Sequence, residues 1–182
     1  MHKTTLAVAF ILVVAVELVA VRPVLAQGKQ GFGFKGTVSG FPTGIVFLSG
    51  GGAYDPATAS NAVPSDTFAN AGGGFRCLAG VEQGPLKGCA AREGVRWDTV
   101  QLLASTQFKC TAAEAPKLAT TSDDLVVLLA DFYRAGDGID ESFTAQMIVS
   151  GHDIAPDKNL WVQGVGCGRA IGTWGQDEPC CP

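Results

Sequence analysis

The sequence predicts an all-β protein, folded as an antiparallel barrel of about seven or eight strands, with a β-sandwich as the alternative. Runs of β-branched and aromatic residues are short, and glycine, proline and other turn formers separate them. Helical periodicity is scarce along the chain. The barrel is favoured over the sandwich because closing a sheet leaves no exposed strand edge, and because small residues that alternate along strands suit closure.

The chain begins with a segment that predicts export. Residues 6–16 are an uninterrupted apolar run, and Ala26 offers a small residue for cleavage. Glu17 and Arg22 interrupt the apolar character, whereas a membrane-spanning helix needs about 20 predominantly apolar residues. We therefore expect residues 1–26 to be a signal peptide, the mature form to be secreted or periplasmic, and that form not to be embedded in a membrane. An uncleaved anchor is the alternative.

The six cysteines all follow this segment, and an even number in an exported chain predicts disulfides. Two bridges within the domain are expected among the four that lie in or beside predicted strands, namely Cys77, Cys89, Cys110 and Cys167. Their pairing stays open. Adjacent Cys180 and Cys181 could close only a strained ring, so they are expected to bridge to the body or to another chain, or to remain thiols. A zinc site is disfavoured because the chain has no C-x-x-C pair.

The charge balance argues against nucleic acid as a partner. The expected mature chain has 11 basic and 16 acidic residues (13 minus Lys3 and Arg22; 17 minus Glu17), which gives a net charge of −5. Its basic residues are scattered singly and form no cationic footprint. Its length suits one domain, so we expect a single β domain at 27–174 and an irregular, cysteine-containing tail at 175–182. The oligomeric state stays open.

The first strands are expected before residue 51. "GFGFKGTVSG" places Phe32, Phe34 and Val38 on alternate positions, and "GIVFLSG" is a short apolar run. Residues 51–71 are rich in glycine, alanine and polar turn formers, so we expect a long surface loop there. A loop of that length is typically functional or partly disordered.

The middle of the chain predicts two further strand regions. Residues 73–81 read as a strand, and residues 82–94 as a connection. Residues 95–110, "VRWDTVQLLASTQFKC", contain strand material that is broken near its centre. Residues 112–124 are expected to be a polar linker, with at most one helical turn, which Pro116 would limit.

Residues 126–134 and 141–150 predict a hairpin with 135–140 as its loop. One register makes every pair on one face apolar: Phe132–Phe143, Ala130–Ala145, Leu128–Met147 and Val126–Val149. Arg134 meets Glu141 at the rim of that face, and the other face pairs Tyr133–Ser142, Asp131–Thr144 and Leu129–Gln146. Shifting this register by one residue would mix apolar and polar side chains on each face, whereas the register shifted by two residues remains an alternative. Residues 159–174 predict the last long strand, and 152–158 the turn before it.

The hairpin loop, "AGDGIDE", is rich in carboxylates. Asp137, Asp140 and Glu141 are the candidate metal ligands, and calcium is the ion that such oxygen ligands would suit. The spacing D-x-[DN]-x-[DN]-G is absent. Because glycines and aspartates at these positions also suit a tight turn, a turn without a metal is the preferred interpretation, and no cofactor is expected.

Asp131, Tyr133 and Arg134 are the candidate catalytic residues. If the face that carries Asp131 and Tyr133 lined the inside of a barrel, Asp131 could serve as acid or base in an isomerase or cyclase, with Tyr133 or Arg134 assisting. The preferred interpretation places that face outside, in solvent. No G-x-S-x-G nucleophile pattern occurs, and His152 is expected on the surface. Whether the protein is an enzyme stays open.

The leading functional hypothesis is an exported protein that binds a small apolar ligand or a glycan. Aromatic and polar side chains on glycine-rich strands suggest it, and the candidate ligand contacts are Trp97, Asp131, Tyr133, Gln146 and Trp161. For Trp97, core packing is the preferred interpretation. Lipocalins carry a G-x-W signature near the first strand, whereas Gly172–Trp174 lies at the end of this chain, so that resemblance fails. A structural or surface-assembly role is a further alternative, favoured by the terminal cysteine pair.

Overall fold

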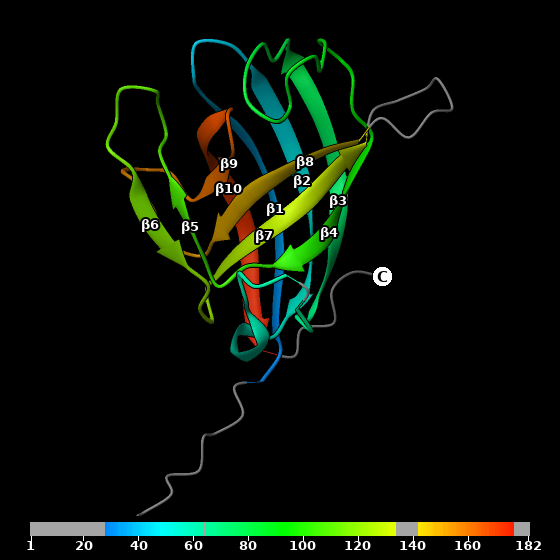
Figure 1. Cartoon of the computed structure of the whole chain (residues 1–182), viewed down its shortest axis with the longest axis vertical. Helices are drawn as coiled ribbons and strands as arrows, with labels where there is room; N and C mark the ends of the chain where they lie inside the picture. Colours follow the sequence, from blue (N-terminus) through cyan, green and yellow to red (C-terminus); the bar gives the residue numbers. More distant parts are fainter. Residues whose placement is uncertain (1–27, 64, 134–141, 177–182) are drawn as a thin grey trace, which may run out of the picture.

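The computed structural model describes residues 28–63, 65–133 and 142–176, which form a closed, eight-stranded antiparallel barrel (Figure 1). Around the barrel the strand order is β1-β10-β9-β8-β7-β4-β3-β2. The predicted all-β barrel is therefore confirmed, and the sandwich alternative is not what the chain forms. The expected signal peptide, the loop of the 126–150 hairpin and residues 177–182 of the expected tail lie outside the described residues, whereas Gly175 and Gln176 belong to the last barrel strand.

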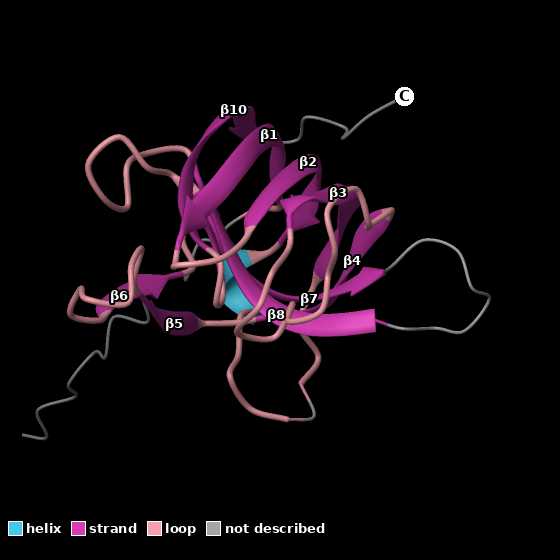
Figure 2. Ribbon diagram, turned by 90° about the horizontal axis from the view of Figure 1, so that it is seen from above, coloured by secondary structure: helices cyan, strands magenta, loops and turns pink. Residues whose placement is uncertain are grey.

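The barrel strands are β1 (Gln30–Gly40), β2 (Ile45–Tyr54), β3 (Ala69–Ala79), β4 (Arg96–Leu102), β7 (Leu125–Tyr133), β8 (Ser142–Ser150), β9 (Leu160–Val162) and β10 (Gly166–Gln176). A separate hairpin of β5 (Ser105–Phe108) and β6 (Lys117–Thr120) lies beside the barrel wall (Figure 2). The described residues also contain one short 3-10 helix, η1 (Pro56–Thr58). In those residues no helix has the length and apolar character that crossing a membrane requires.

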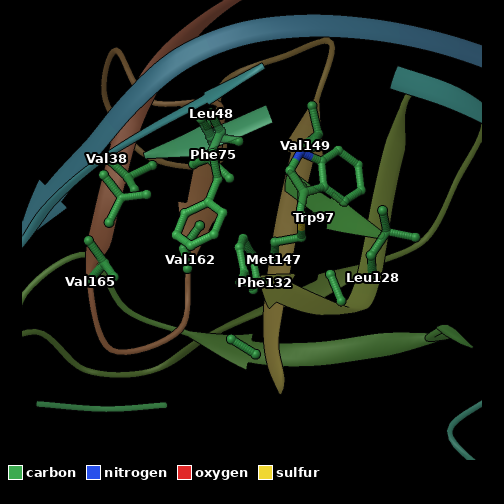
Figure 3. Close-up of a cluster of buried hydrophobic side chains, with 14 of the residues drawn as sticks. Val38, Leu48, Phe75, Trp97, Leu128, Phe132, Met147, Val149, Val162 and Val165 are labelled. Carbon is green, nitrogen blue, oxygen red and sulfur yellow. The ribbon is translucent and has the colours of Figure 1, made fainter. Parts of the chain in front are cut away.

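The barrel interior is filled by side chains. On β7, Val126, Leu128, Ala130 and Phe132 are fully buried and belong to one apolar cluster with residues of the other barrel strands (Figure 3). The largest of these side chains is Trp97 of β4, which is also fully buried. An eight-stranded barrel is just wide enough for its inward side chains to fill it. The centre of this barrel is accordingly a packed core.

The register expected for the hairpin of β7 and β8 is confirmed. Phe132 pairs with Phe143, and the pairing continues without a shift to Val126 opposite Val149. The apolar face points into the barrel and the face with Asp131 points outward. The expected contact of Arg134 with Glu141 falls outside the described residues. Burial of one face therefore determines which side chains of the hairpin point inward. The observed pairing also excludes the register shifted by two residues, which the sequence had left open.

The long loop expected at 51–71 is wrong at both ends, because β2 continues to Tyr54 and β3 begins at Ala69. The glycines there are strand residues that pair with one another: Gly50 lies opposite Gly73, and Gly51 opposite Gly72. Bare backbone on the inner face leaves room for the indole of Trp97, since a Cβ added at Gly50 would lie 2.8 Å from its Cζ2 atom. Glycine composition suggested a loop, whereas pairing between two glycine runs makes a strand.

Two further expectations need correction. Residues 112–124 are not a linker throughout, because β6 pairs with β5 and buries Ala119 against the outer face of the barrel. The sequence signal was weak, since Ala119 is the one buried residue of β6. The last long strand is also divided: β9 and β10 form a hairpin whose turn contains Gly164 at φ 78°. A positive φ favours glycine and reverses the chain there. The break expected within 95–110 is confirmed between β4 and β5.

Two disulfides join the four cysteines expected to form them. Cys77 of β3 is bonded to Cys89 in the connection towards β4, with 6.3 Å between their Cα atoms. Cys110, just after β5, is bonded to Cys167 of β10, with 4.8 Å between the Cα atoms. The second bridge fastens the outer hairpin to the barrel. Disulfides persist in oxidising compartments, and these two fit such a location.

Candidate functional site

The candidate ligand contacts predicted from sequence do not form one site. Trp97 is enclosed in the barrel interior, and its Nε1–H donates to the Ser49 carbonyl at 3.0 Å. Trp161 and Gln146 are brought together beneath the outer hairpin. There the Trp161 Nε1–H donates to the Lys109 carbonyl at 3.0 Å, and Gln146 Oε1 accepts a hydrogen bond from the Thr106 hydroxyl. These contacts hold the outer hairpin against the barrel.

Asp131 and Tyr133 lie on the outer face of the wall. The Asp131 carboxylate accepts a hydrogen bond from the Thr144 hydroxyl at 2.6 Å, and the Arg96 guanidinium lies 4.6 Å from the centre of the Tyr133 ring. The acid–base role considered for Asp131 required a place inside the barrel, and the structure puts it outside because the apolar face of β7 fills the interior. Arg134 and the candidate metal ligands of the hairpin loop fall outside the described residues.

A different feature marks a candidate site, namely an incomplete stretch of the barrel wall beside β10. Strand β10 pairs with β1 along its whole length but with β9 only over Gly166–Gly168. For one more residue Asn159 replaces the missing strand: its Oδ1 accepts from the Ala170 N–H at 2.7 Å and its Nδ2 donates to the Ala170 carbonyl at 3.1 Å. We call the opening bounded by Ser150, Asn159 and residues 170–174 the seam.

The edge of β10 at the seam carries backbone groups without a strand partner. Backbone N–H and C=O groups of alternate residues point to the same side of a strand. Because those of Ala170 point to Asn159, those of Gly172 and Trp174 point into the seam. Among the described residues neither Gly172 nor Trp174 has a hydrogen bond on that side. Such an edge offers donors and acceptors to an incoming molecule.

A cavity of about 260 Å³ lies in the seam. Its lining combines apolar and polar side chains, including Phe34, Val149, Trp174, Ser150, Asn159 and Arg169. The half-buried indole of Trp174 is held by neighbouring rings: its centre lies 5.5 Å from that of Phe32 and 6.2 Å from that of Tyr54. It also covers Gly151, where an added Cβ would lie 3.1 Å from the indole Cδ1. The indole is therefore fixed in position.

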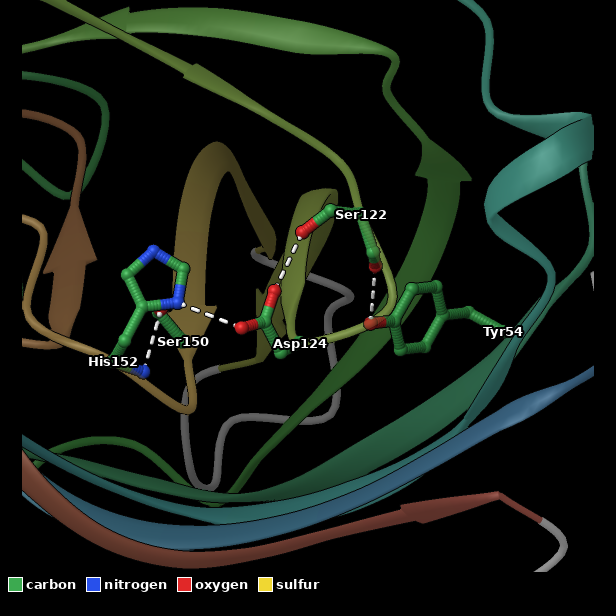
Figure 4. A network of polar contacts seen from close by, with 5 residues as sticks. All are labelled: Tyr54, Ser122, Asp124, Ser150 and His152. Atoms are coloured by element: carbon green, nitrogen blue, oxygen red, sulfur yellow. Dashed lines mark hydrogen bonds and ion pairs between the residues drawn. The ribbon is translucent and has the colours of Figure 1, made fainter.

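A chain of polar contacts supports the same end of the barrel (Figure 4). The Tyr54 hydroxyl donates to the Ser122 carbonyl at 2.7 Å, and the Ser122 hydroxyl donates to Asp124 Oδ1 at 2.8 Å. His152 Nδ1 lies 3.0 Å from Asp124 Oδ2, and the His152 N–H donates to the Ser150 hydroxyl oxygen at 3.1 Å. The chain thus runs from a ring that contacts Trp174 to a side chain of the cavity wall.

The pKa values of Tyr54 and Asp124 are both shifted in the direction that preserves their hydrogen bonds. Burial raises the pKa of the Tyr54 hydroxyl above its ordinary value, and the carboxylates of Asp124 and Asp123 raise it further. Tyr54 therefore stays a neutral donor. The hydrogen bond from Ser122 holds the pKa of the Asp124 carboxyl below its ordinary value, and the neighbouring His152 adds to this effect. Asp124 is accordingly an acceptor at neutral pH.

Within the described part of the chain, no three His, Cys, Asp or Glu side chains are grouped to hold a metal ion. Arg169, on the cavity wall, pairs with Asp153 at 2.6 Å. Sequence reasoning missed Trp174 and Asn159 as site residues. A tryptophan in a glycine-rich terminal strand was the available signal, but the gap in the wall depends on where β9 begins.

No protein-family model, curated protein or solved structure matches the chain, so a functional argument rests on its own residues.

Proposed function

We propose that the protein is an exported binding protein, and that the seam takes one sugar unit of a glycan or a small apolar ring of similar size. Trp174 carries the proposal. It is the one tryptophan whose Nε1–H has no hydrogen-bond partner among the described residues, whereas Trp97 and Trp161 each donate to a backbone carbonyl. Its ring also lines a cavity. The indole therefore places an apolar ring and an N–H without a described partner beside one cavity.

A sugar unit suits this mixture of groups. The C–H face of a sugar ring packs on an aromatic ring, and its hydroxyls need donors and acceptors around the edge. The backbone groups of Gly172, the Ser150 hydroxyl and the Arg169 guanidinium supply such partners. The cavity is somewhat smaller than the roughly 300–1,000 Å³ of pockets for drug-sized molecules, which favours a single ring. Because the barrel interior is packed, the ligand has no place deeper inside.

Export is the second part of the proposal. Two disulfides support an oxidising compartment. The signal peptide at 1–26 stays a prediction, and sequencing the amino terminus of the exported protein tests it. A start at Gln27 is expected, and an intact amino terminus on a protein recovered with the membrane would contradict it.

Ligand-observed NMR tests the binding site. The methyl glycosides of glucose, galactose and N-acetylglucosamine, with p-cresol as an apolar ring, are titrated against the protein. At least one is expected to receive magnetisation from the protein, most strongly at ring C–H protons. Trp174→Ala should weaken that binding about tenfold or more, which corresponds to about 1.4 kcal/mol. Leu118→Ala, an exposed residue of the outer hairpin, is the matched control and should leave it unchanged.

Two outcomes would refute the site. Equal binding by the Trp174→Ala and wild-type proteins would remove the seam from the proposal. Absence of binding by every probe would remove the ligand class.

The enzyme alternative is not favoured, because the Asp131 carboxylate lies on the outer face. The assembly alternative depends on Cys180 and Cys181, beyond the described residues, and a non-reducing gel would detect a covalent dimer.

A further inference from the structure

A second cavity, of about 620 Å³, lies on the outer face of β2 and β3 and against the chain that leads into β4. Its walls are apolar side chains that solvent reaches: Phe47, Leu78 and Val95 are 37%, 50% and 53% exposed. None of its lining residues lines the seam. We call it the outer groove.

Two glycines give the outer groove its depth. Gly74 faces outward from β3, and an added Cβ would lie 3.3 Å from the Ser49 hydroxyl oxygen. Gly94 has a φ of 107°, and a Cβ there would lie 2.9 Å from the Phe75 ring. A side chain at either position would therefore fill the groove or displace its floor. Bare backbone at these two positions lets a ligand approach closely.

The groove also gathers unpaired positive charge. Four arginines are described, and two of them, Arg96 and Arg169, pair with a nearby aspartate. The other two, Arg76 and Arg92, form no ion pair with any described residue, and both line the outer groove. The protein is net acidic, at −4 for the full chain, and yet these two guanidinium groups line one cavity.

The disulfide brings these two arginines together although 16 positions separate them in the sequence (92 minus 76). Arg76 precedes Cys77 on β3, and Cys77 is bonded to Cys89 in the following connection. The Arg92 N–H then donates to the Cys77 carbonyl at 2.6 Å, which fixes the backbone of Arg92 against β3. Two like charges held on one wall repel each other, and an anion between them relieves that repulsion.

We propose that the outer groove binds a small anionic amphiphile, a carboxylate with an apolar chain or ring. The guanidinium groups of Arg76 and Arg92 would hold the carboxylate, since arginine binds carboxylates through paired N–H donors. Phe47, Leu78 and Val95 would cover the apolar part. The volume falls within the range of ligand pockets, about 300–1,000 Å³. This site is separate from the seam, and either can bind without the other.

Calorimetric titration with decanoate tests the groove, with decanol as the matched ligand that lacks the charge. Decanoate is expected to bind at one site and decanol to bind at least about tenfold more weakly. The double variant Arg76→Gln/Arg92→Gln should weaken decanoate binding about tenfold or more, to the level of decanol. Arg96→Gln removes an arginine outside the groove and should bind decanoate as the wild type does. Equal loss in the two arginine variants, or equal affinity for decanol, would overturn the proposal.

A second pair of variants leaves both arginines in place. Leu78→Glu puts a carboxylate into the groove beside the guanidinium groups and should abolish decanoate binding, whereas the neutral Leu78→Gln removes only an apolar contact and should weaken binding less. Similar binding by these two proteins would contradict the charge argument. Binding to vesicles of anionic lipid without binding of dispersed decanoate would also overturn the proposal, because the surface would then recognise a membrane and not a small amphiphile.

Discussion

Alanine at Gly73 tests the glycine-lined interior, since the neighbouring Gly74 offers a control that faces outward. Gly73 lies opposite Gly50 on β2 and opposite Trp97 on β4. An added Cβ at Gly73 would run into the Ser49 carbonyl oxygen and the Gly50 Cα. Because both obstacles are backbone atoms, no side-chain rotation relieves the clash, and the strands must move apart.

The size of the effect follows from opposing contributions. Overpacking a core costs about 1–3 kcal/mol, and a clash with backbone belongs at the upper end. Replacing glycine in a strand restricts the unfolded chain and returns about 0.5–1 kcal/mol. We expect Gly73→Ala to lower the free energy of unfolding by about 2 kcal/mol, which for a domain of this size lowers Tm by about 4–8 °C. At Gly74 the nearest atom is a hydroxyl oxygen 3.3 Å away that can rotate aside, so Gly74→Ala should change Tm by at most about 2 °C.

Thermal unfolding followed by circular dichroism, with the disulfides intact, measures both variants. Urea denaturation gives the free energies, and an unchanged slope shows that the unfolded states are comparable. If the two alanine variants were equally stable, the pairing of the two glycine runs would be wrong, and with it the place of Trp97 against them.

Three further perturbations follow from the same structure. Removing the Cys110–Cys167 bridge, which spans 57 residues, should lower the free energy of unfolding by about 4 kcal/mol through loop-closure entropy. Removing the 12-residue Cys77–Cys89 bridge should lower it by about 3 kcal/mol. Urea denaturation of variants with both cysteines of a bridge replaced by alanine measures each loss, and the reverse order would contradict the estimate. Trp97→Ala should lower the free energy of unfolding by about 3–5 kcal/mol, because it empties part of the core and leaves the Ser49 carbonyl without its donor. As a control, the exposed Val100→Ala should lower it by less than about 0.5 kcal/mol in the same assay. Comparable losses in the two variants would show that Trp97 is not part of the core. The lowered pKa of Asp124 means that its stabilisation is present above the unfolded pKa of about 3.9 and is lost as the pH falls through the lower folded pKa. The free energy of unfolding of Asp124→Asn should therefore fall less steeply below about pH 4 than that of the wild type. The same pH dependence in both proteins would be inconsistent with the Ser122 and His152 contacts.

The hairpin of β7 and β8 could be predicted, apart from a slip of two residues, because its information is local. Apolar side chains alternate from Val126 to Phe132, and the partner strand repeats the alternation. Only one parity buries both sets. The glycine runs at 50–52 and 72–74 carried no such signal, since glycine has no side chain whose burial could be read from a pattern. Their strand character arises from pairing with each other across the η1 connection.

The seam could not be predicted from the sequence, for a different reason. It depends on β9 beginning only at Leu160 while β10 continues to Gln176, which leaves a strand edge beside Trp174. That mismatch between two strands is a property of their pairing and not of either segment. The outer face of Asp131 and the core position of Trp97, by contrast, agree with the preferred interpretations of their patterns, because each lies on a strand with clear alternation.

The indole N–H signals of the three tryptophans test the central claim most directly. In ¹H–¹⁵N spectra Trp97 and Trp161 should be protected from solvent exchange by their bonds to backbone carbonyls, whereas Trp174 should exchange faster. On adding the sugar that ligand-observed NMR selects, the Trp174 signal should shift and saturate while the other two stay in place. A Trp174 signal that remains still while the sugar binds, or equal shifts of all three signals, would contradict a binding site in the seam.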